Sequence, residues 1–79
     1  MEFEQLQAII ADVLNVNLDE INPDSTFVDD FGADSLDIAQ IMMGVEDELG
    51  VDIDPSEMDD IVTVSDALNK IRAALAANE

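Results

Sequence analysis

The chain has 79 residues and contains neither cysteine nor histidine, and its 20 acidic residues against 2 basic ones give a formal net charge of −18 at pH 7. These counts exclude disulfides and thiolate metal sites, and they remove the side chain that most often acts as a base at neutral pH. The charge repels nucleic acid and anionic membranes and attracts basic protein surfaces, so neither nucleic-acid binding nor membrane insertion is expected.

The N-terminal segment predicts an amphipathic helix over residues 2–15. Apolar side chains recur there at the spacing of one helix face, at Phe3, Leu6, Ile9, Ile10, Val13 and Leu14. Asn15 and Asn17 are suited to ending the helix, because asparagine tolerates the left-handed conformation. The acidic start is unlike a secretory signal, and no stretch reaches the ~20 apolar residues of a membrane span, so we expect a cytoplasmic protein.

Residues 16–34 are expected to form a long, ordered loop. The sequence Asn22-Pro23-Asp24-Ser25 within it is a turn signal. Loops of this length are uncommon in compact domains unless they are functional. Several apolar side chains in the loop predict that it packs on the helices, namely Val16, Leu18, Ile21, Phe27, Val28 and Phe31.

A second helix is expected over residues 35–49, and Gly50 is suited to ending it. Its inner face carries apolar residues at Ile38, Ile41, Met42, Val45 and Leu49. Leu36 and Met43 fall outside this face. Two interpretations of that pair stay open: single exposed apolar side chains are normal, but two of them ringed by acids also resemble a small docking surface.

A short third helix is expected over about residues 56–61. Pro55 suits its first turn, because the start of a helix leaves backbone N–H groups unpaired and proline has none. Met58 and Ile61, one helical turn apart, are then expected to point toward the core.

A fourth helix is expected over residues 64–76, after a capping-box pattern formed by Thr63 and Asp66. No segment shows the alternating pattern of a strand. The predicted fold class is therefore all-α, a small four-helix bundle of three longer helices and one short helix, with a long loop after the first helix. We expect a single domain over residues 1–79 and a monomer.

Catalysis by the chain itself is not expected. A serine nucleophile needs an adjacent base, and only carboxylates stand near Ser35. Paired acids such as Asp29 and Asp30 are usually solvated in an acid-rich loop. A calcium-binding EF-hand loop needs a carboxylate five residues before its glycine, and an apolar residue precedes each glycine of this chain at that distance. The sequence therefore predicts no catalytic residue and no dedicated metal site.

Ser35 stands at the start of the second helix, where serine usually serves as an N-cap. Asp34 is an equally good cap, however, and Asp37 follows it at the spacing of a capping box. If Asp34 caps the helix, Ser35 lies in the first turn with its hydroxyl outward. A phosphodiester on that hydroxyl would then be stabilised by the positive end of the helix dipole.

Three segments of the chain resemble the acyl carrier protein family. They are TFVDDFGADSLD at residues 26–37, EDELGVDI at 46–53 and IVTVSDAL at 61–68. The resemblance implies that Ser35 carries 4′-phosphopantetheine, which a phosphopantetheinyl transferase attaches from coenzyme A. It also implies that the thiol of this arm holds acyl groups as thioesters, so the cofactor supplies the sulfur that the chain lacks.

The resemblance also implies a partner surface and an acyl pocket. The partner surface, which would bind the transferase and the basic surfaces of fatty acid synthesis enzymes, consists of Asp34, Leu36, Asp37, Met43, Glu46 and Asp47. The acyl pocket would be lined by Phe27, Ile41, Val45, Ile53, Met58 and Ile61. Met58 is larger than the alanine that is common at its position in the family, so a shorter pocket is expected.

Two alternatives to a fatty-acid-synthesis carrier stay open at this point. Within the family, the chain could serve a polyketide pathway or another specialised pathway. From a different class, it could be an acidic interaction or ion-binding protein without a prosthetic group. The mass of the protein isolated from its own cells separates a carrier protein from a protein without a prosthetic group.

Overall fold

The computed structural model describes residues 2–77, which form four α-helices and two 3₁₀ helices. These elements follow one another as α1 (Glu2–Leu14), η1 (Leu18–Glu20), α2 (Phe27–Phe31), α3 (Ser35–Leu49), η2 (Pro55–Asp60) and α4 (Val64–Ala77). The predicted all-α fold class is confirmed. Two expectations need correction, because the short helix expected at 56–61 is a 3₁₀ helix that begins one residue earlier, and the loop expected over 16–34 contains η1 and α2.

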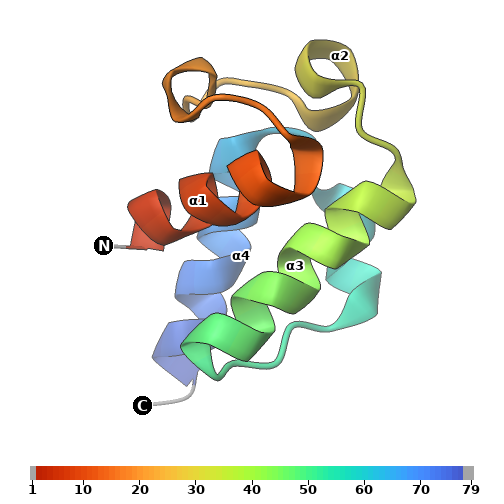
Figure 1. Cartoon of the computed structure of the whole chain (residues 1–79). Coiled ribbons are helices and arrows are strands. Elements are labelled where there is room, and N and C mark those ends of the chain that lie inside the picture. Colours follow the sequence, from red (N-terminus) through yellow and green to blue (C-terminus); the bar gives the residue numbers. More distant parts are fainter. Residues whose placement is uncertain (1, 78–79) are drawn as a thin grey trace.

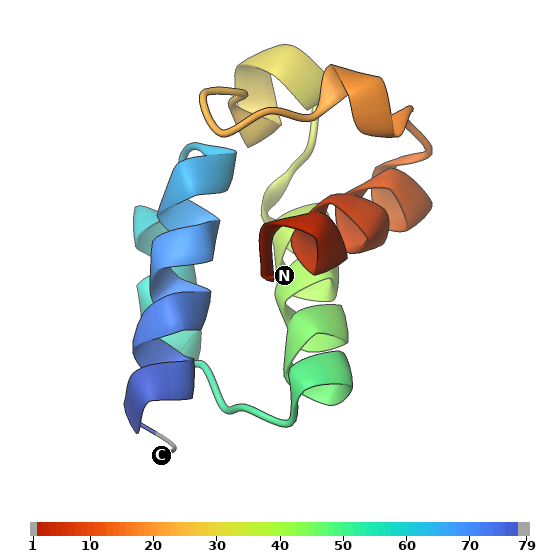
Figure 2. The same cartoon turned by 90° about the vertical axis from the view of Figure 1, so that its left-hand side faces the viewer.

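The longest helix is α3. Two elements, α1 and η2, each pack against both α3 and α4. Figure 1 and Figure 2 show α3 and α4 side by side and running in the same direction. η2 carries the chain back from the end of α3 to the start of α4, which is what allows two successive long helices to run parallel. α1 packs on the opposite side of the pair from η2 (Figure 2).

The apolar stripes seen in the sequence form the core. The largest side chains with almost no exposure come from all four α-helices and are Leu6, Ile10, Phe27, Ile41, Met42, Val45, Val64 and Ile71. α1 ends at Leu14, one residue before the predicted end, because Asn15 takes a left-handed φ of 58°. Gly50 ends α3 in the same conformation, with a φ of 67°.

The long connection between α1 and α3 is fastened to the start of α4 by three backbone hydrogen bonds, which we call the backbone clasp. The Phe27 N–H donates to the Val62 carbonyl at 3.0 Å. In the other direction, the Val64 N–H donates to the Ser25 carbonyl at 2.9 Å, and the Ser65 N–H donates to the Pro23 carbonyl at 3.0 Å. The clasp explains how a segment with few helical residues is held in one place.

The sequence does not predict α2, because a helix of five residues is too short to show a repeating stripe. Its first turn is closed by Asp30, whose Oδ2 accepts hydrogen bonds from the Thr26 N–H at 2.7 Å and the Thr26 hydroxyl at 3.2 Å. Phe27 is fully buried, and its ring meets the edge of the Phe31 ring with the centroids 6.3 Å apart. Tertiary packing therefore stabilises α2.

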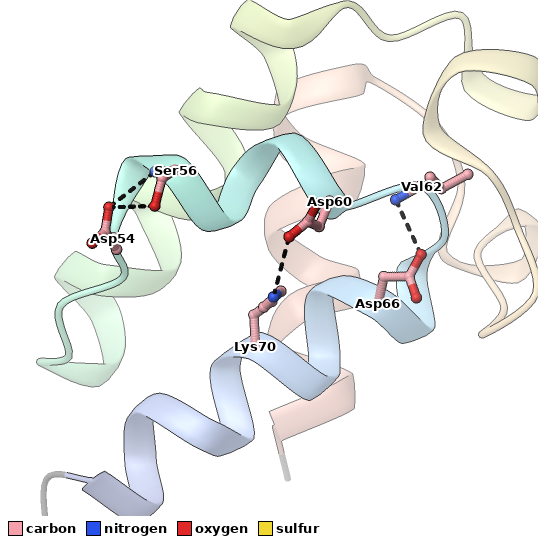
Figure 3. Close-up of polar contacts among 6 residues, drawn as sticks. All are labelled: Asp54, Ser56, Asp60, Val62, Asp66 and Lys70. Atoms are coloured by element: carbon pink, nitrogen blue, oxygen red, sulfur yellow. Dashed lines mark hydrogen bonds and ion pairs between the residues drawn. The ribbon is translucent and has the colours of Figure 1, made fainter.

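Both basic side chains of the chain lie on α4 and form ion pairs. Lys70 Nζ lies 3.9 Å from Asp60 Oδ2 at the end of η2 (Figure 3), and Arg72 Nε lies 3.6 Å from Glu2 Oε1 on α1. Exposed pairs of this kind contribute about 0–1 kcal/mol each. They leave nearly all of the acidic surface without a positive neighbour.

The capping box predicted at the start of α4 is present. Asp66 Oδ2 accepts hydrogen bonds from the Thr63 N–H at 3.0 Å and the Val62 N–H at 3.1 Å, and Thr63 Oγ1 accepts one from the Asp66 N–H at 3.1 Å. Figure 3 shows the bond to Val62. These bonds, first that from the Thr63 N–H, hold the pKa of Asp66 below its ordinary value of 3.8.

Asp66→Asn is expected to lower the free energy of unfolding by about 1 kcal/mol at neutral pH, because it weakens hydrogen bonds to a charged acceptor. Since the folded pKa lies below the unfolded one, the contribution of the carboxylate is complete above the unfolded pKa and is lost as the pH falls through the folded pKa. The difference between wild type and variant should therefore shrink below about pH 4 in urea titrations.

Asp59→Asn is the matched control for this experiment. Asp59 is exposed on η2, and its carboxylate makes no hydrogen bond or ion pair with the other described residues. Its replacement removes the same charge as Asp66→Asn and should leave the free energy of unfolding nearly unchanged both at neutral pH and below about pH 4. Equal effects at the two positions would mean that net charge, and not the capping box, sets the stability.

Candidate functional site

The turn before α3 is held by backbone hydrogen bonds to α2. Gly32 has a φ of 65°, which glycine adopts without strain, and its N–H donates to the carbonyls of Phe27 and Val28. The Ala33 N–H donates to the Phe27 carbonyl at 2.9 Å, and the Ala33 side chain is buried. The turn therefore places Asp34 at a fixed point at the start of α3.

Of the two caps that the sequence leaves open, Asp34 and Ser35, the N-cap of α3 is Asp34. Its Oδ1 accepts a hydrogen bond from the Asp37 N–H at 2.9 Å, and Asp37 Oδ2 accepts one from the Asp34 N–H at 3.2 Å. Ser35 is thereby left as the first residue of the helix. Its side chain is exposed, and its hydroxyl makes no hydrogen bond with the other described residues. This hydroxyl is available for chemistry.

The start of α3 favours an anionic group on Ser35. The first N–H groups of a helix lack partners within the helix and carry the positive end of its dipole. Asp34 and Asp37 lie next to the serine, but each already accepts a backbone hydrogen bond from the other. A phosphate group on the Ser35 hydroxyl would therefore sit beside N–H groups, with open solvent on its other side.

The outer face of α3 carries the two apolar residues whose interpretation the sequence leaves open. The side chains of Leu36 and Met43 are 67% and 60% exposed, and Asp47 is exposed on the same helix. Side chains this large are exposed at few other places in the described chain. This exposure is what a docking surface requires, and the partner surface stays a prediction.

Besides the cap residue Asp34, two more of the acids predicted for the partner surface hold the protein's own backbone, namely Asp37 and Glu46. Asp37 completes the capping box with Asp34. Glu46 Oε2 accepts a hydrogen bond from the Ile53 N–H at 2.8 Å, across the loop that follows α3. Both side chains are only partly exposed. Charge reversal at either position would therefore disturb the fold as well as any contact with a partner.

An open groove of about 750 Å³ lies between α3 and η2. It is lined by Ala39, Met43, Glu46, Asp52, Ile53, Asp54 and Met58. Ala39 is four residues after Ser35, and Met43 is four residues after Ala39, so these side chains follow one row along α3. The groove thus begins one helical turn from the Ser35 hydroxyl.

Of the six residues predicted to line an acyl pocket, the groove brings together Ile53 and Met58. Ile53 is buried in the wall, and Met58 is half-buried on η2. The other four do not line the groove and belong to the hydrophobic core, namely Phe27, Ile41, Val45 and Ile61. A role for those four in acyl binding stays a prediction.

Sequence reasoning missed the contribution of Ala39 and of the loop carboxylates Asp52 and Asp54. The signal for Ala39 is present, because a small residue four positions after a candidate attachment serine lies beside it on the helix surface. No comparable signal marks Asp52 and Asp54, since their place at the groove depends on how the loop after α3 folds back toward η2.

The carboxylates at the groove are not arranged as a metal site. Asp54 Oδ1 accepts hydrogen bonds from the Ser56 N–H at 3.0 Å and the Ser56 hydroxyl at 2.9 Å (Figure 3), and these bonds, first that from the N–H, lower the pKa of Asp54. Among residues 2–77, no three histidine, cysteine or acidic side chains are grouped so as to hold a metal ion.

None of the helices within residues 2–77 combines the length and the apolar character that a membrane-spanning helix needs.

The chain matches a protein family described as the phosphopantetheine attachment site over residues 4–71. It is also similar to curated acyl carrier proteins. The similarity to that of Clostridium perfringens is 48% identity over 69 residues, covering 87% of this chain and 91% of the relative. For the acyl carrier protein of Clostridium acetobutylicum it is 41% over 73 residues, covering 92% and 95%. For that of Solidesulfovibrio magneticus it is 46% over 68 residues, covering 86% and 87%.

The fold is similar to a solved structure of an acyl carrier protein from Thermotoga maritima. The TM-score is 0.85, and the match covers 100% of this chain and 96% of the other. The sequence identity between the two is 24%. At an identity of 24%, this likeness supports the fold alone. The similarity in sequence is shown by the acyl carrier proteins named above.

Proposed function

Because the chain belongs to the acyl carrier protein family, whose members carry the phosphopantetheine attachment site, we propose that it carries acyl intermediates of fatty acid synthesis on an arm attached to Ser35. The cofactor is 4′-phosphopantetheine, whose thiol supplies the thioester chemistry when it is bound. The observation that carries the proposal is the pairing of an exposed Ser35 with a separate helix cap at Asp34.

The residues around Ser35 fit the cofactor. Ser35 would hold the phosphate of the arm at the N-terminal end of α3, which is the favourable end of the helix dipole for an anion. The hydroxyl is not needed for capping, so its substitution leaves the hydrogen bonds between Asp34 and Asp37 intact. One helical turn away, the apolar wall formed by Ala39, Met43 and Met58 offers a place for an uncharged chain.

Attachment of the arm is a phosphoryl transfer that balances without any further reactant. The Ser35 oxygen forms a bond to the phosphorus on the pantetheine side of coenzyme A. The pyrophosphate P–O bond breaks, and the adenosine bisphosphate half leaves with the electron pair. The hydroxyl proton goes to a base, which we assign to the transferase, because the carboxylates nearest to Ser35 in sequence, Asp34 and Asp37, already accept hydrogen bonds from the backbone.

The proposed partners are the phosphopantetheinyl transferase and fatty acid synthesis enzymes with basic surfaces. The formal charge of −18 and the exposed Leu36 and Met43 support this, since charge steers association and apolar side chains bury area in the contact. We further propose that the chain acts as a single-domain monomer in the cytoplasm. The continuous hydrophobic core of residues 2–77 supports the single domain.

The test of the proposal is the mass of the protein after incubation with coenzyme A, magnesium and a phosphopantetheinyl transferase of broad tolerance. We expect the addition of one phosphopantetheinyl group, on the peptide that contains Ser35. The controls are Ser25, Ser56 and Ser65, which lie in turns or near caps and should stay unmodified. Modification at one of these serines, or none at all, would overturn the assignment of Ser35.

Charge reversal at Asp47 is expected to slow both loading by the transferase and turnover by acyl-transferring enzymes. Asp47 is exposed, and its carboxylate makes no hydrogen bond with the other described residues, so Asp47→Lys tests the surface without disturbing the fold. Like charges brought together at an interface cost up to several kcal/mol, which predicts a rise in KM for the carrier by about tenfold or more.

Asp12→Lys is the control for this surface. Asp12 is exposed on α1, and its replacement by lysine changes the net charge by the same amount as Asp47→Lys. Steady-state rates against carrier concentration should show a much smaller effect for this variant. If Asp12→Lys and Asp47→Lys slow the reactions equally, only net charge matters, and α3 is not the docking element.

A further inference from the structure

Glu46 connects the outer face of α3 to the wall of the groove. Its Oε2 accepts the hydrogen bond from the Ile53 N–H at 2.8 Å, and both residues line the groove between α3 and η2. Ile53 is only 4% exposed and belongs to the hydrophobic core. Core packing of its side chain and the hydrogen bond from its N–H to one half-buried carboxylate together fix where this section of the loop lies against α3.

The loop from Gly50 to Asp54 packs into the core through Val51 and Ile53, but few hydrogen bonds among the described residues tie its backbone to α3. The N–H groups of Gly50 and Val51 donate to the Glu46 carbonyl at 2.9 and 3.2 Å, which fixes the first part of the loop. Further along the loop, the Ile53 N–H is tied to α3 by its hydrogen bond to the Glu46 carboxylate. Loss of this bond would free the N–H of a buried residue and loosen the wall that Ile53 forms.

Glu46 also faces the region to which basic partners would bind. The neighbouring acids Asp47 and Asp52 are exposed, and both basic side chains of the chain are engaged elsewhere, with Asp60 and with Glu2. Only Oε2 of Glu46 is used by Ile53. A cation from outside can therefore approach Glu46 without competition from the protein's own lysine or arginine.

We propose that Glu46 is a positioning residue that holds Ile53 in the groove wall, and that an arginine of a docking partner releases it. The inference rests on the proposed carrier function and adds how docking affects the bound acyl chain. A guanidinium that pairs with both oxygens of a carboxylate competes directly with the Ile53 N–H. An ammonium is a point charge and can bind the unused Oε1 alone, so lysine leaves the Ile53 bond in place.

The first test uses the unmodified protein, so that it does not depend on loading of Ser35. Amide hydrogen exchange of Ile53 should be about tenfold faster in Glu46→Ala, because a hydrogen bond to a charged acceptor is lost. Glu46→Gln keeps an acceptor oxygen and should show a smaller increase. Glu48→Ala, which removes the same charge from an exposed position on α3, is the control and should leave Ile53 unchanged.

The second test compares a short arginine peptide with a lysine peptide of equal length and charge, followed by NMR of the Ile53 amide. The arginine peptide should shift the amide signal and speed its exchange, whereas the lysine peptide should do so far less. In Glu46→Gln this difference should disappear, since the neutral amide does not form the bidentate pair. Equal effects of both peptides on wild-type Ile53 would overturn the role of arginine.

The third test uses the protein loaded with an octanoyl group and measures cleavage of the thioester by hydroxylamine. Glu46→Ala should be cleaved faster than wild type, and Glu48→Ala should not. Unchanged exchange at Ile53 in Glu46→Ala, or unchanged cleavage in its loaded form, would overturn the proposal for Glu46 and leave the carrier function untouched. Failure to load wild-type Ser35 would instead overturn the carrier function, while the first test would still decide the role of Glu46 at Ile53.

Discussion

Ser35→Ala is expected to abolish loading of the protein with phosphopantetheine and, with it, all activity as a carrier. The oxygen that forms the phosphodiester is absent from this variant, and no neighbouring side chain can replace it. Stability should change little, because Asp34 and not Ser35 caps α3. Intact mass after incubation with the transferase measures the loading, and urea unfolding measures the stability.

Asp34→Ala separates the two roles of this turn. It removes the cap and should cost about 1 kcal/mol of stability while the Ser35 hydroxyl remains available for loading. If Ser35→Ala instead lost stability comparable to Asp34→Ala, the serine would be a structural residue. If Ser35→Ala were still modified at residues 26–37, the attachment site would lie elsewhere in that segment.

Phe27→Ala is expected to destabilise the fold by about 3–5 kcal/mol, the range for removing a buried aromatic side chain. Phe27 is the largest fully buried side chain among residues 2–77, and its backbone belongs to both the clasp and the turn before Ser35. Small domains are stable by about 5–15 kcal/mol, so this loss is a large part of the total. Thermal unfolding followed by circular dichroism measures it.

Val28→Ala is the neighbouring control. Val28 follows Phe27 in α2 and is 63% exposed, so its truncation should change stability by no more than about 0.5 kcal/mol. The loading rate of Phe27→Ala should also fall, because the turn that presents Ser35 loses its anchor. A loss below about 1 kcal/mol for Phe27→Ala would mean that α2 does not depend on the packing described above.

The parts of the fold that could be predicted are those that local rules determine. The stripes of α1, α3 and α4 repeat over several turns, so their period identifies both the helices and their buried faces. The spacing of Asp34 and Asp37 makes Asp34 as good a candidate for the cap as Ser35, and the two hydrogen bonds in the structure select Asp34. Exposure of Ser35 follows from that cap.

The parts that could not be predicted depend on contacts between distant segments. α2 forms because Phe27 is buried and its N–H reaches Val62, which no local pattern reveals. The groove requires η2 to lie beside α3, and the structural role of Glu46 requires the loop to bring Ile53 back to it. An acid on an exposed stripe looks the same in sequence whether or not a backbone N–H returns to it.

The backbone clasp has a consequence for the order of events during synthesis. It joins Ser25 to Val64 and Phe27 to Val62, pairs that are about 40 positions apart in the chain, so closing it carries the entropy cost of a long loop. Contacts of this range form after local helices have formed. During synthesis the clasp therefore closes only after the first residues of α4 have left the ribosome, so Phe27, which anchors the turn before Ser35, gains its long-range partner late.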